Sequence, residues 1–344
     1  MAISIKGLKP QDEVAWDEFV SQHPNGTPFH LLAWKRSIQE TFQYQPTYLL
    51  AMDDTRICGV LPLFLVENFV IGRVLISCPF AVYGGILADS PEASTALQLY
   101  VRSFGNELRV DHVELRNAHP EQCSAAPQVS QYVTFTQQTE TDELTLLATL
   151  PKKTRNIVRK VLRMNYETRI ESSDFRRFED LYSRNMRRLG TPSFPRRHFS
   201  SLKTHFGSMV DVREVLLDGK VVAASLNFYF RDHMHVYYAA SDPAFKGSAP
   251  NNYMYFDHLR WAGQNGYRTF DFGRCKRGTG VFEFKRHWAT TMRELPYETV
   301  LIRRNDIPNN TPTNPRFRLA IETWKSVPLP ITRLLGPQLI RLFP

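Results

Sequence analysis

Apolar and polar positions in the first part of the chain predict helices and strands in a mixed order. A helix that starts after Asp12 and ends near residue 23 would bury one stripe, made of Val14, Trp16, Phe19 and Val20. Further helices are predicted at 30–42 and 91–108. Apolar runs bounded by turn residues predict strands at 2–6, 48–52, 56–66, 74–77, 81–87 and 111–115, with a bulge at 83–85.

The second part of the chain repeats this order. Asp174 caps a predicted helix that Gly190 ends, and its buried face would be Phe175, Phe178, Tyr182, Met186 and Leu189. A second helix is predicted at 195–206, and a third begins at Asn251 or Asn252 and ends near residue 265. Strands are predicted at 168–171, 210–217, 221–230, 233–241 and 267–272, with a hairpin turn at Asp218-Gly219.

The shared order predicts an α+β fold built from two copies of one unit, each with a mixed, mainly antiparallel sheet flanked by helices. We place the first domain at 1–145 and the second, which would carry the active site, at 166–312. Residues 146–165 would form a connecting helix. Residues 313–344 would form an amphipathic C-terminal tail.

Composition is that of a globular protein, with 42% hydrophobic and 22% charged residues. No window reaches the ~18 apolar residues that span a bilayer, and residues 1–16 lack an apolar core of signal-peptide length. We therefore expect a cytoplasmic protein. The four cysteines have neither zinc-ligand spacing nor a disulfide pattern, so we expect no metal, and Cys275 is interpreted as an idle thiol.

Positive charge is concentrated in one sixth of the chain. Residues 150–200 contain fourteen Lys or Arg and five acids, against a net charge of +9 for the whole chain. On the connecting helix, one quarter of the circumference would carry Lys152, Arg155, Arg159 and Arg163. We call these four residues the basic ridge. It predicts contact with a polyanion such as RNA, and the alternative is a solvated helix face.

Candidate chemistry is concentrated at 267–288, where a strand ends in Phe270-Asp271-Phe272-Gly273. Glycines at 273, 278 and 280 allow tight turns and close approach of other groups. Cations lie between them, so the loop is a candidate anion cradle formed by Arg274, Lys276, Arg277, Gly278 and Gly280. The alternative is a solvated basic loop. A nucleotide-binding P-loop is excluded, because Thr279 and Gly280 stand where lysine and Ser/Thr are required.

The C-terminal tail carries two apolar stripes among basic residues. The first consists of Phe317, Ile321 and Trp324, and the second of Leu334, Leu335, Leu339, Ile340, Leu342 and Phe343. Such a segment can rest on the inner membrane surface, which would give a peripheral location there. The alternative is that the tail packs on the body of the protein.

The repeated unit resembles the GNAT acyltransferase fold, and two such units in tandem resemble the FemA/FemB/FemX family. The matching segments are 270–273, 278–280 and Phe284-Lys285, supported by 153–156 and 190–192. The resemblance covers nearly the whole chain. It is closest to the FemAB-like branch associated with exosortase (PEP-CTERM) exopolysaccharide systems.

The resemblance implies transfer of an acyl or aminoacyl group onto an amine of a cell-envelope or exopolysaccharide acceptor. It places Lys285 at the reaction centre, where an ammonium would stabilise the carbonyl oxyanion. Asp271 would orient the amine or take a proton, the alternative being a structural aspartate. Further substrate-binding residues would be Phe284, Tyr238 and Asn252.

The resemblance also implies aminoacyl-tRNA as donor, an anionic saccharide or lipid-linked acceptor, and no bound cofactor. Residues 245–252 lack the spacing of the pyrophosphate-binding loop of CoA-dependent GNAT enzymes, so acyl-CoA is the less favoured donor. Two other functions stay open. One is a CoA-dependent N-acetyltransferase, and the other is a non-catalytic tandem module that binds RNA or anionic lipid.

Overall fold

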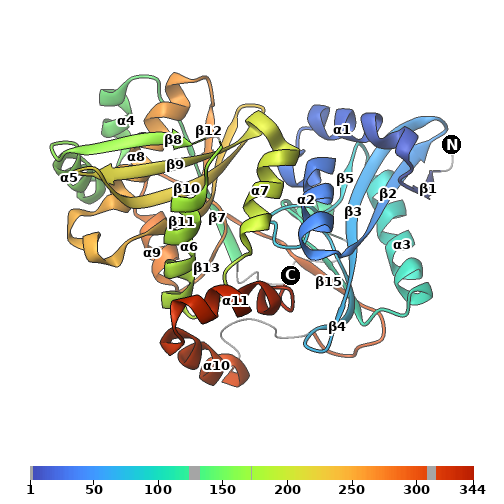
Figure 1. Cartoon of the computed structure of the whole chain (residues 1–344). Coiled ribbons are helices and arrows are strands. Elements are labelled where there is room, and N and C mark those ends of the chain that lie inside the picture. Colours follow the sequence, from blue (N-terminus) through green and yellow to red (C-terminus); the bar gives the residue numbers. More distant parts are fainter. Residues whose placement is uncertain (1–2, 124–131, 172, 308–314) are drawn as a thin grey trace. The chain divides into compact units, whose positions relative to one another are not determined.

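The computed structural model describes residues 3–123, 132–171, 173–307 and 315–344, and the chain forms two compact units (Figure 1). Unit 1 consists of Met1–Ser130, Leu295–Leu319 and Gln338–Pro344. Unit 2 consists of Gln131–Glu294 and Ala320–Pro337. The chain therefore passes between the units more than once.

Unit 1 is built on a seven-stranded sheet in the order β1-β2-β3-β4-β6-β15, with β5 paired to β3. All neighbours are antiparallel except β4 and β6, which are parallel. Leu49 packs in a core with helix α3, while its neighbour Tyr48 contacts Trp16 of α1, so both faces are covered. The strands are β1 (Ser4–Gly7), β2 (Gln45–Asp53), β3 (Arg56–Asn68), β4 (Gly72–Ile76), β5 (Leu87–Ala88), β6 (His112–Leu115) and β15 (Glu298–Leu301), and the helices are α1 (Glu13–Gln22), α2 (Leu32–Phe42) and α3 (Pro91–Glu107).

Unit 2 is built on an eight-stranded sheet in the order β13-β7-β12-β11-β10-β9-β8, with β14 paired to β7. Among the described strands of this sheet, β11 and β12 pair in parallel and the other neighbours pair antiparallel. Its strands are β7 (Tyr132–Gln138), β8 (Tyr166–Glu171), β9 (Val210–Leu217), β10 (Lys220–Phe230), β11 (His233–Ser241), β12 (Thr269–Asp271), β13 (Cys275–Lys276) and β14 (Thr291–Glu294).

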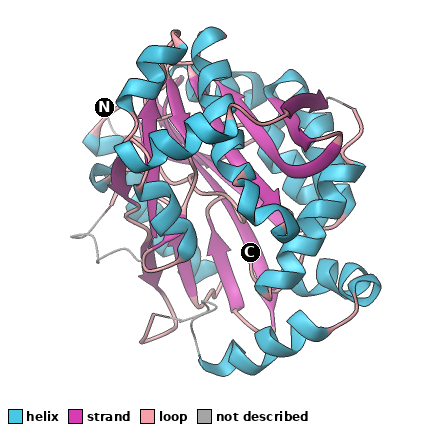
Figure 2. Cartoon of the chain, turned by 90° about the vertical axis from the view of Figure 1, so that its left-hand side faces the viewer, coloured by secondary structure: helices cyan, strands magenta, loops and turns pink. Residues whose placement is uncertain are grey.

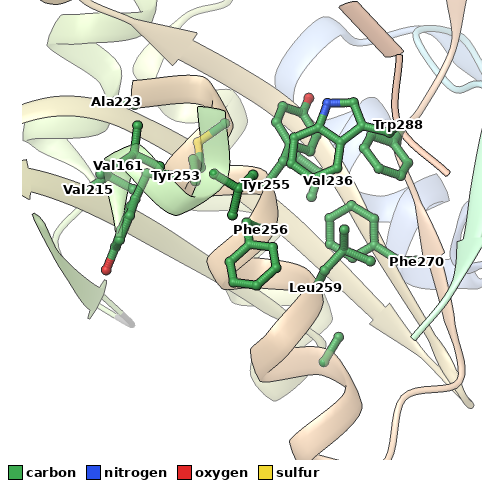
Figure 3. Packing of buried hydrophobic residues seen from close by; sticks show 14 of the residues in the cluster. Val161, Val215, Ala223, Val236, Tyr253, Tyr255, Phe256, Leu259, Phe270 and Trp288 are labelled. Carbon is green, nitrogen blue, oxygen red and sulfur yellow. The ribbon is translucent and has the colours of Figure 1, made fainter. Parts of the chain in front are cut away.

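Helices cover both faces of the second sheet. Figure 2 shows the helices and strands of the whole chain in separate colours. One face packs on α4 (Glu143–Thr149), α5 (Lys152–Val161), α8 (Pro250–Gln264) and α9 (Gly280–Arg286). The core on this face joins Val161, Phe256, Phe270 and Trp288 (Figure 3). The other face packs on α6 (Arg176–Leu189) and α7 (Arg196–Phe206).

The two units share one element order, which confirms the predicted α+β repeat. Each has a short strand, two helices, three antiparallel strands, a helix and a final strand, and the final strand pairs in parallel with the third antiparallel strand. Strand β7 lies in the sheet of unit 2 and β15 in the sheet of unit 1. The domain boundaries given above from the sequence stay a prediction.

The strand predicted at 81–87, with its bulge, is wrong, because only Leu87–Ala88 is a strand there. The preceding segment is a buried loop in which Cys78 and Phe80 have positive φ angles. Gly85 lies so close to Asn117 that a Cβ at this position would clash with the Asn117 side chain. An apolar run that is buried on all sides has the sequence pattern of a strand even when it forms a packed loop.

Some helix details also differ from the prediction. Val14 and Leu189, placed on buried faces, are exposed. Helix α8 begins at Pro250 with Ala249 as its N-cap, instead of at Asn251 or Asn252. Strand β7 and helices α4 and α9 have no counterpart among the predicted elements.

The C-terminal tail forms helices α10 (Pro315–Ser326) and α11 (Leu329–Ile340). In unit 2, the indole N–H of Trp324 donates to the Thr191 carbonyl (3.2 Å), and Ile321 lies against Gly190. Part of the tail therefore packs on the end of α6. Over the described residues, no helix is long and apolar enough to cross a membrane.

Candidate active site

Strands β11 and β12 diverge after a short parallel pairing. They pair from His233 opposite Thr269 to His235 opposite Asp271, whereas β11 continues to Ser241 beside β10. Within the described ranges, the β11 edge from Val236 onward has no strand partner on the β12 side. Such an edge offers backbone N–H and C=O groups to an extended ligand.

The chain leaves β12 through Gly273, which has a φ angle of +74°. A Cβ here would lie 3.1 Å from the Val236 carbonyl oxygen and 3.8 Å from Lys285 Nζ. Glycine is therefore required both for the left-handed backbone and for the close approach to β11. Gly278 also has a positive φ, +75°, but a Cβ there or at Gly280 would meet nothing within 4 Å.

Lys285 lies beneath this turn, at the point where the two strands separate. It belongs to α9, is 4% exposed, and donates from Nζ to the carbonyl oxygens of Gly273 (2.7 Å) and Arg274 (3.3 Å). Burial lowers the pKa of this amine from 10.5 to about 8, and Arg274 acts in the same direction, against Cys275 and Asp271. An ammonium has three N–H donors, so one remains for another acceptor.

Asp271 is buried and holds the turn together. Its Oδ1 accepts hydrogen bonds from Thr134 Oγ1 (2.9 Å) and from the Gly273 amide (2.7 Å). His235 Nδ1 lies 3.3 Å from Oδ2. Because both carboxylate oxygens have partners within the unit, this geometry favours a positioning role over proton abstraction.

The cations of the loop have separate partners. The Arg277 guanidinium pairs with Glu294 (2.6 Å), and that of Arg274 lies 4.8 Å from the ring centroid of Tyr132. Lys276 is half-buried in β13. A shared anion cradle formed by these three side chains stays a prediction.

Cys275, between them, is buried, and burial raises the pKa of its thiol even though Lys285 and Arg277 act in the opposite direction. This suits an idle thiol. No group of three His, Cys, Asp or Glu side chains that could hold a metal ion occurs in the described part of the chain.

A pocket of about 130 Å³ lies on the helical side of unit 2 that carries α5, α8 and α9. Phe284 and Trp288 give it aromatic walls, while Lys153, Asn252 and His287 supply polar groups. Thr154, which also lines it, donates through Oγ1 to the His287 carbonyl and ties α5 to the end of α9. The remaining lining residue is Ile157.

The pocket brings together two predicted residues, Asn252 and Phe284, that are 32 positions apart in the chain. Sequence reasoning did not place the other lining residues there. Their spacing is a usable signal, because Phe284, His287 and Trp288 stand at i, i+3 and i+4 across the end of α9.

Tyr238 lies on the opposite side of the sheet from the pocket. Its hydroxyl is 3.0 Å from His198 Nε2, and its ring packs edge-on against Tyr182 and Phe199. Burial raises the pKa of this phenol well above its usual value. A β-bulge between Leu226 and Asn227 shifts the register at this point of β11. The contacts of Tyr238 are those of an aromatic core residue, and its predicted role in substrate binding has no support from them.

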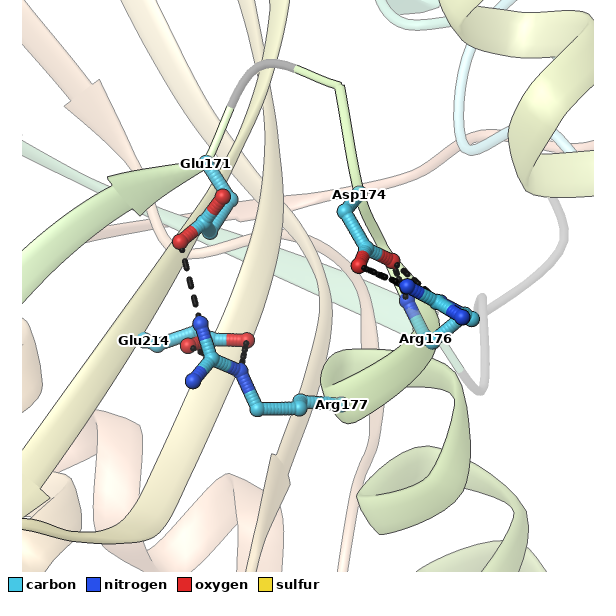
Figure 4. Close-up of polar contacts among 5 residues, drawn as sticks. All are labelled: Glu171, Asp174, Arg176, Arg177 and Glu214. Carbon is cyan, nitrogen blue, oxygen red and sulfur yellow. Dashed lines mark hydrogen bonds and ion pairs between the residues drawn. The ribbon is translucent and has the colours of Figure 1, made fainter.

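Many cations of the 150–200 segment are neutralised by neighbours. Arg176 pairs with Asp174, and Arg177 pairs with Glu171 and with the buried Glu214 (Figure 4). Further ion pairs on α6 and α7 join Arg184 to Asp180 and Arg196 to Glu179. The positive charges of Arg176, Arg177 and Arg184 on α6 are therefore compensated.

The basic ridge, on α5 and the turn that follows it, differs in this respect. Lys152, Arg159 and Arg163 are exposed, and none of them makes an ion pair within the described residues. Arg155 is half-buried instead and donates to the carbonyls of Leu150 and Ala148 at the end of α4. Three of the four predicted ridge residues are thus available to an external anion.

Part of the chain matches a known domain family, and most of the chain shares its fold with solved structures. Residues 151–286 match the family model described as "Acetyltransferase (GNAT) domain". This segment lies in unit 2 and contains Lys285, Asp271 and the whole loop between them. No curated protein matches the chain significantly in sequence.

Solved structures with a similar fold cover almost the whole chain. FemX is 15% identical, with a TM-score of 0.69 over 92% of this chain and all of that chain. L-PGS from Bacillus licheniformis is 13% identical, with a TM-score of 0.54 over 96% of this chain and 98% of that one. A tandem GNAT protein from the clavulanic acid biosynthesis pathway is 10% identical, with a TM-score of 0.53 over 88% of this chain and all of that one. At these identities the likeness shows a common fold. The chain therefore has the fold of FemX and of tandem GNAT proteins, and residues 151–286 of unit 2 match the GNAT domain family.

Proposed function

We propose that the protein is an acyltransferase that moves an acyl or aminoacyl group from an activated ester or thioester onto an amine of a cell-envelope or exopolysaccharide acceptor. The observation that carries the proposal is the buried Lys285 ammonium at the divergence of β11 and β12. The GNAT family match over the same segment supports it. The acceptor amine, the donor carbonyl and Lys285 would meet at this divergence.

In the proposed reaction, the amine attacks the donor carbonyl and a C–N bond forms. The carbonyl oxygen becomes an oxyanion, which the free N–H of Lys285 would stabilise by an amount of the order of 3 kcal/mol. The C–O or C–S bond then breaks, and the leaving oxygen or sulfur takes up the proton that the amine releases. With a pKa of about 8, Lys285 is mainly protonated at neutral pH, as this role requires.

Asp271 would act by position. It fixes the Gly273 amide, and Gly273 in turn accepts the Lys285 hydrogen bond. The Asp271 carboxylate thereby fixes the turn that positions the Lys285 ammonium.

The pocket beside α9 is our candidate donor site. Phe284 and Trp288 suit a flat base, and Lys153 suits a phosphate next to it. The exposed ridge residues on α5, the helix that also supplies Lys153, would extend this contact along a polyanion. These features favour an aminoacyl-tRNA as donor.

The first turn of α8 offers little to a pyrophosphate. Pro250 has no N–H, and the amides of Asn252 and Tyr253 already donate to the Ala249 carbonyl. Only Asn251 keeps a free amide in this turn, which makes it a weak phosphate site. This supports the lower rank that we give acyl-CoA as a donor.

The exosortase-type resemblance supports this class of acceptor, and so does the fold that the chain shares with FemX and L-PGS. We propose a lipid-linked or saccharide intermediate of envelope or exopolysaccharide synthesis as the acceptor of this chain.

A CoA-dependent N-acetyltransferase is the second candidate, since the matched family is described as an acetyltransferase domain. Isothermal titration with acetyl-CoA separates the two. We expect no saturable heat at micromolar protein concentration. Tight binding would establish acyl-CoA as the donor.

The main experiment compares envelope polysaccharide from cells with and without the gene by mass spectrometry. We expect an amino-acid or acyl substituent on an amine to be missing without the gene and to return on complementation. Identical spectra in the two strains would contradict a transferase that acts on this material.

A further inference from the structure

Helix α11 exposes an apolar face, which is the reverse of the usual arrangement on a folded protein. Ile331, Leu334 and Leu335 are 45%, 74% and 45% exposed. Their spacing of three and four residues places them on one side of the helix. Scattered single apolar residues are common on surfaces, whereas an aligned set indicates an interaction site.

The other side of α11 is packed within unit 2. Thr332 is buried, and a Cβ at Gly336 would lie 3.2 Å from the backbone of Ser193. Arg333 pairs with Asp180 and donates to Ser183 on α6. One side of α11 therefore packs within unit 2, and the apolar face on the other side is exposed to solvent.

The segment that carries this face is positively charged. From Pro315 to Pro344 the chain has five Lys or Arg and one acid, Glu322. Lys325 pairs with Glu322, and Arg333 pairs with Asp180 of α6. The segment therefore keeps a net positive charge.

Leucine and isoleucine next to arginine and lysine match the chemistry of an anionic bilayer surface, where apolar side chains enter the acyl boundary and cations meet lipid phosphates. A second copy of the chain fits less well. A two-fold contact through this face would place like charges opposite each other. The helix has twelve residues, too few to span a bilayer, so contact would be parallel to the surface.

We propose that the outward face of α11 (Ile331, Leu334 and Leu335) docks the protein on anionic membranes. This surface is separate from the proposed transferase site and does not depend on it. Its function would be to hold the protein at the bilayer.

The test is co-sedimentation of the full chain with vesicles of phosphatidylcholine alone and of phosphatidylcholine mixed with phosphatidylglycerol. We expect binding to the mixed vesicles, weaker binding to the neutral ones, and a decrease as salt concentration rises. The double variant Leu334→Ser, Leu335→Ser should bind the mixed vesicles about tenfold more weakly.

Leu99→Ser combined with Leu144→Ser is the matched control, since these side chains are 67% and 75% exposed on α3 and α4. We expect it to bind like the wild type. Circular dichroism checks that both variants are folded. Equal binding by the α11 variant and the wild type, or no binding to mixed vesicles, would overturn the proposal. So would a wild-type dimer that the α11 variant converts to a monomer, because the face would then meet a second copy.

Discussion

The properties of Lys285 follow from its burial. The Lys285 amine is 4% exposed and donates hydrogen bonds to two backbone carbonyls, which hold it in one place. Burial lowers its pKa to about 8. Sequence reasoning identified the residue through the Phe-Lys pair of a family resemblance. It could not foresee the two carbonyl contacts, because these depend on the turn at Gly273 folding back over α9.

The lowered pKa of Lys285 predicts a pH-dependent stability. In the unfolded chain the amine keeps a proton up to about 10.5, whereas in the folded chain it loses the proton near pH 8. The unfolded state therefore binds more protons between these values, so the free energy of unfolding rises with pH there. The rise is of the order of 3 kcal/mol for this shift.

Urea denaturation of the wild type and of Lys285→Met, at a series of pH values from about 7 to 10.5, measures this effect. We expect the wild type to gain stability relative to the variant as pH rises through this window. Parallel curves for the two proteins would show that the amine is not desolvated.

Gly273 and Gly278 form a matched pair for a second prediction at this scale. Both have φ near +75°, but only at Gly273 would a Cβ approach β11 and Lys285. The substitution Gly278→Ala should lower the free energy of unfolding by about 1–2 kcal/mol, through backbone strain alone. The substitution Gly273→Ala should lower the free energy of unfolding by more, because the contact of the new Cβ with the Val236 carbonyl adds to the strain. Chemical denaturation of both variants checks this, and equal losses would contradict a close approach at Gly273.

At the scale of elements, pattern reasoning succeeded where periodicity is strong and failed where burial hides it. The hairpin of β9 and β10 and the helices α3, α6 and α7 are near their predicted positions. The short helix α9 was read as loop, because Gly280 opens it and glycine disfavours helices. Strand β7 was not predicted, although it pairs with β12, β13 and β14.

The ridge on α5 gives a prediction for this scale. Charge reversal of Lys152, Arg159 and Arg163 should weaken binding of bulk tRNA and lower the slope of log K against log salt by about 2–3, because three phosphate contacts are lost. Filter binding over a range of salt concentrations measures both quantities.

Reversal of Arg176, Arg184 and Arg196 is the control, since these cations already pair with acids on α6 and its surroundings. It changes the net charge by the same amount. If both variants lose affinity equally, the effect is one of overall charge and the ridge is not a specific contact.

At the scale of the whole molecule, the repeat of one α+β unit could be predicted because element order is preserved where sequence identity is not. The chemistry predicted for unit 2 stays a prediction. Lys285 and Asp271 lie together at the strand divergence, and Asn252 and Phe284 line one pocket. Tyr238 lies on the other side of its sheet from the pocket, because the bulge at Leu226 and Asn227 interrupts the alternation of side chains along β11.

The most direct test of the transferase assignment is mass spectrometry of envelope polysaccharide from a gene-deletion strain that expresses either the wild type or Lys285→Met. Methionine keeps the length of the side chain and removes the ammonium, and thermal unfolding with immunoblotting confirms that the variant is folded and present. We predict that the wild type restores the substituent and that the variant lowers it at least about a hundredfold, as expected when an oxyanion donor is lost. Full restoration by Lys285→Met would contradict the catalytic role of this residue.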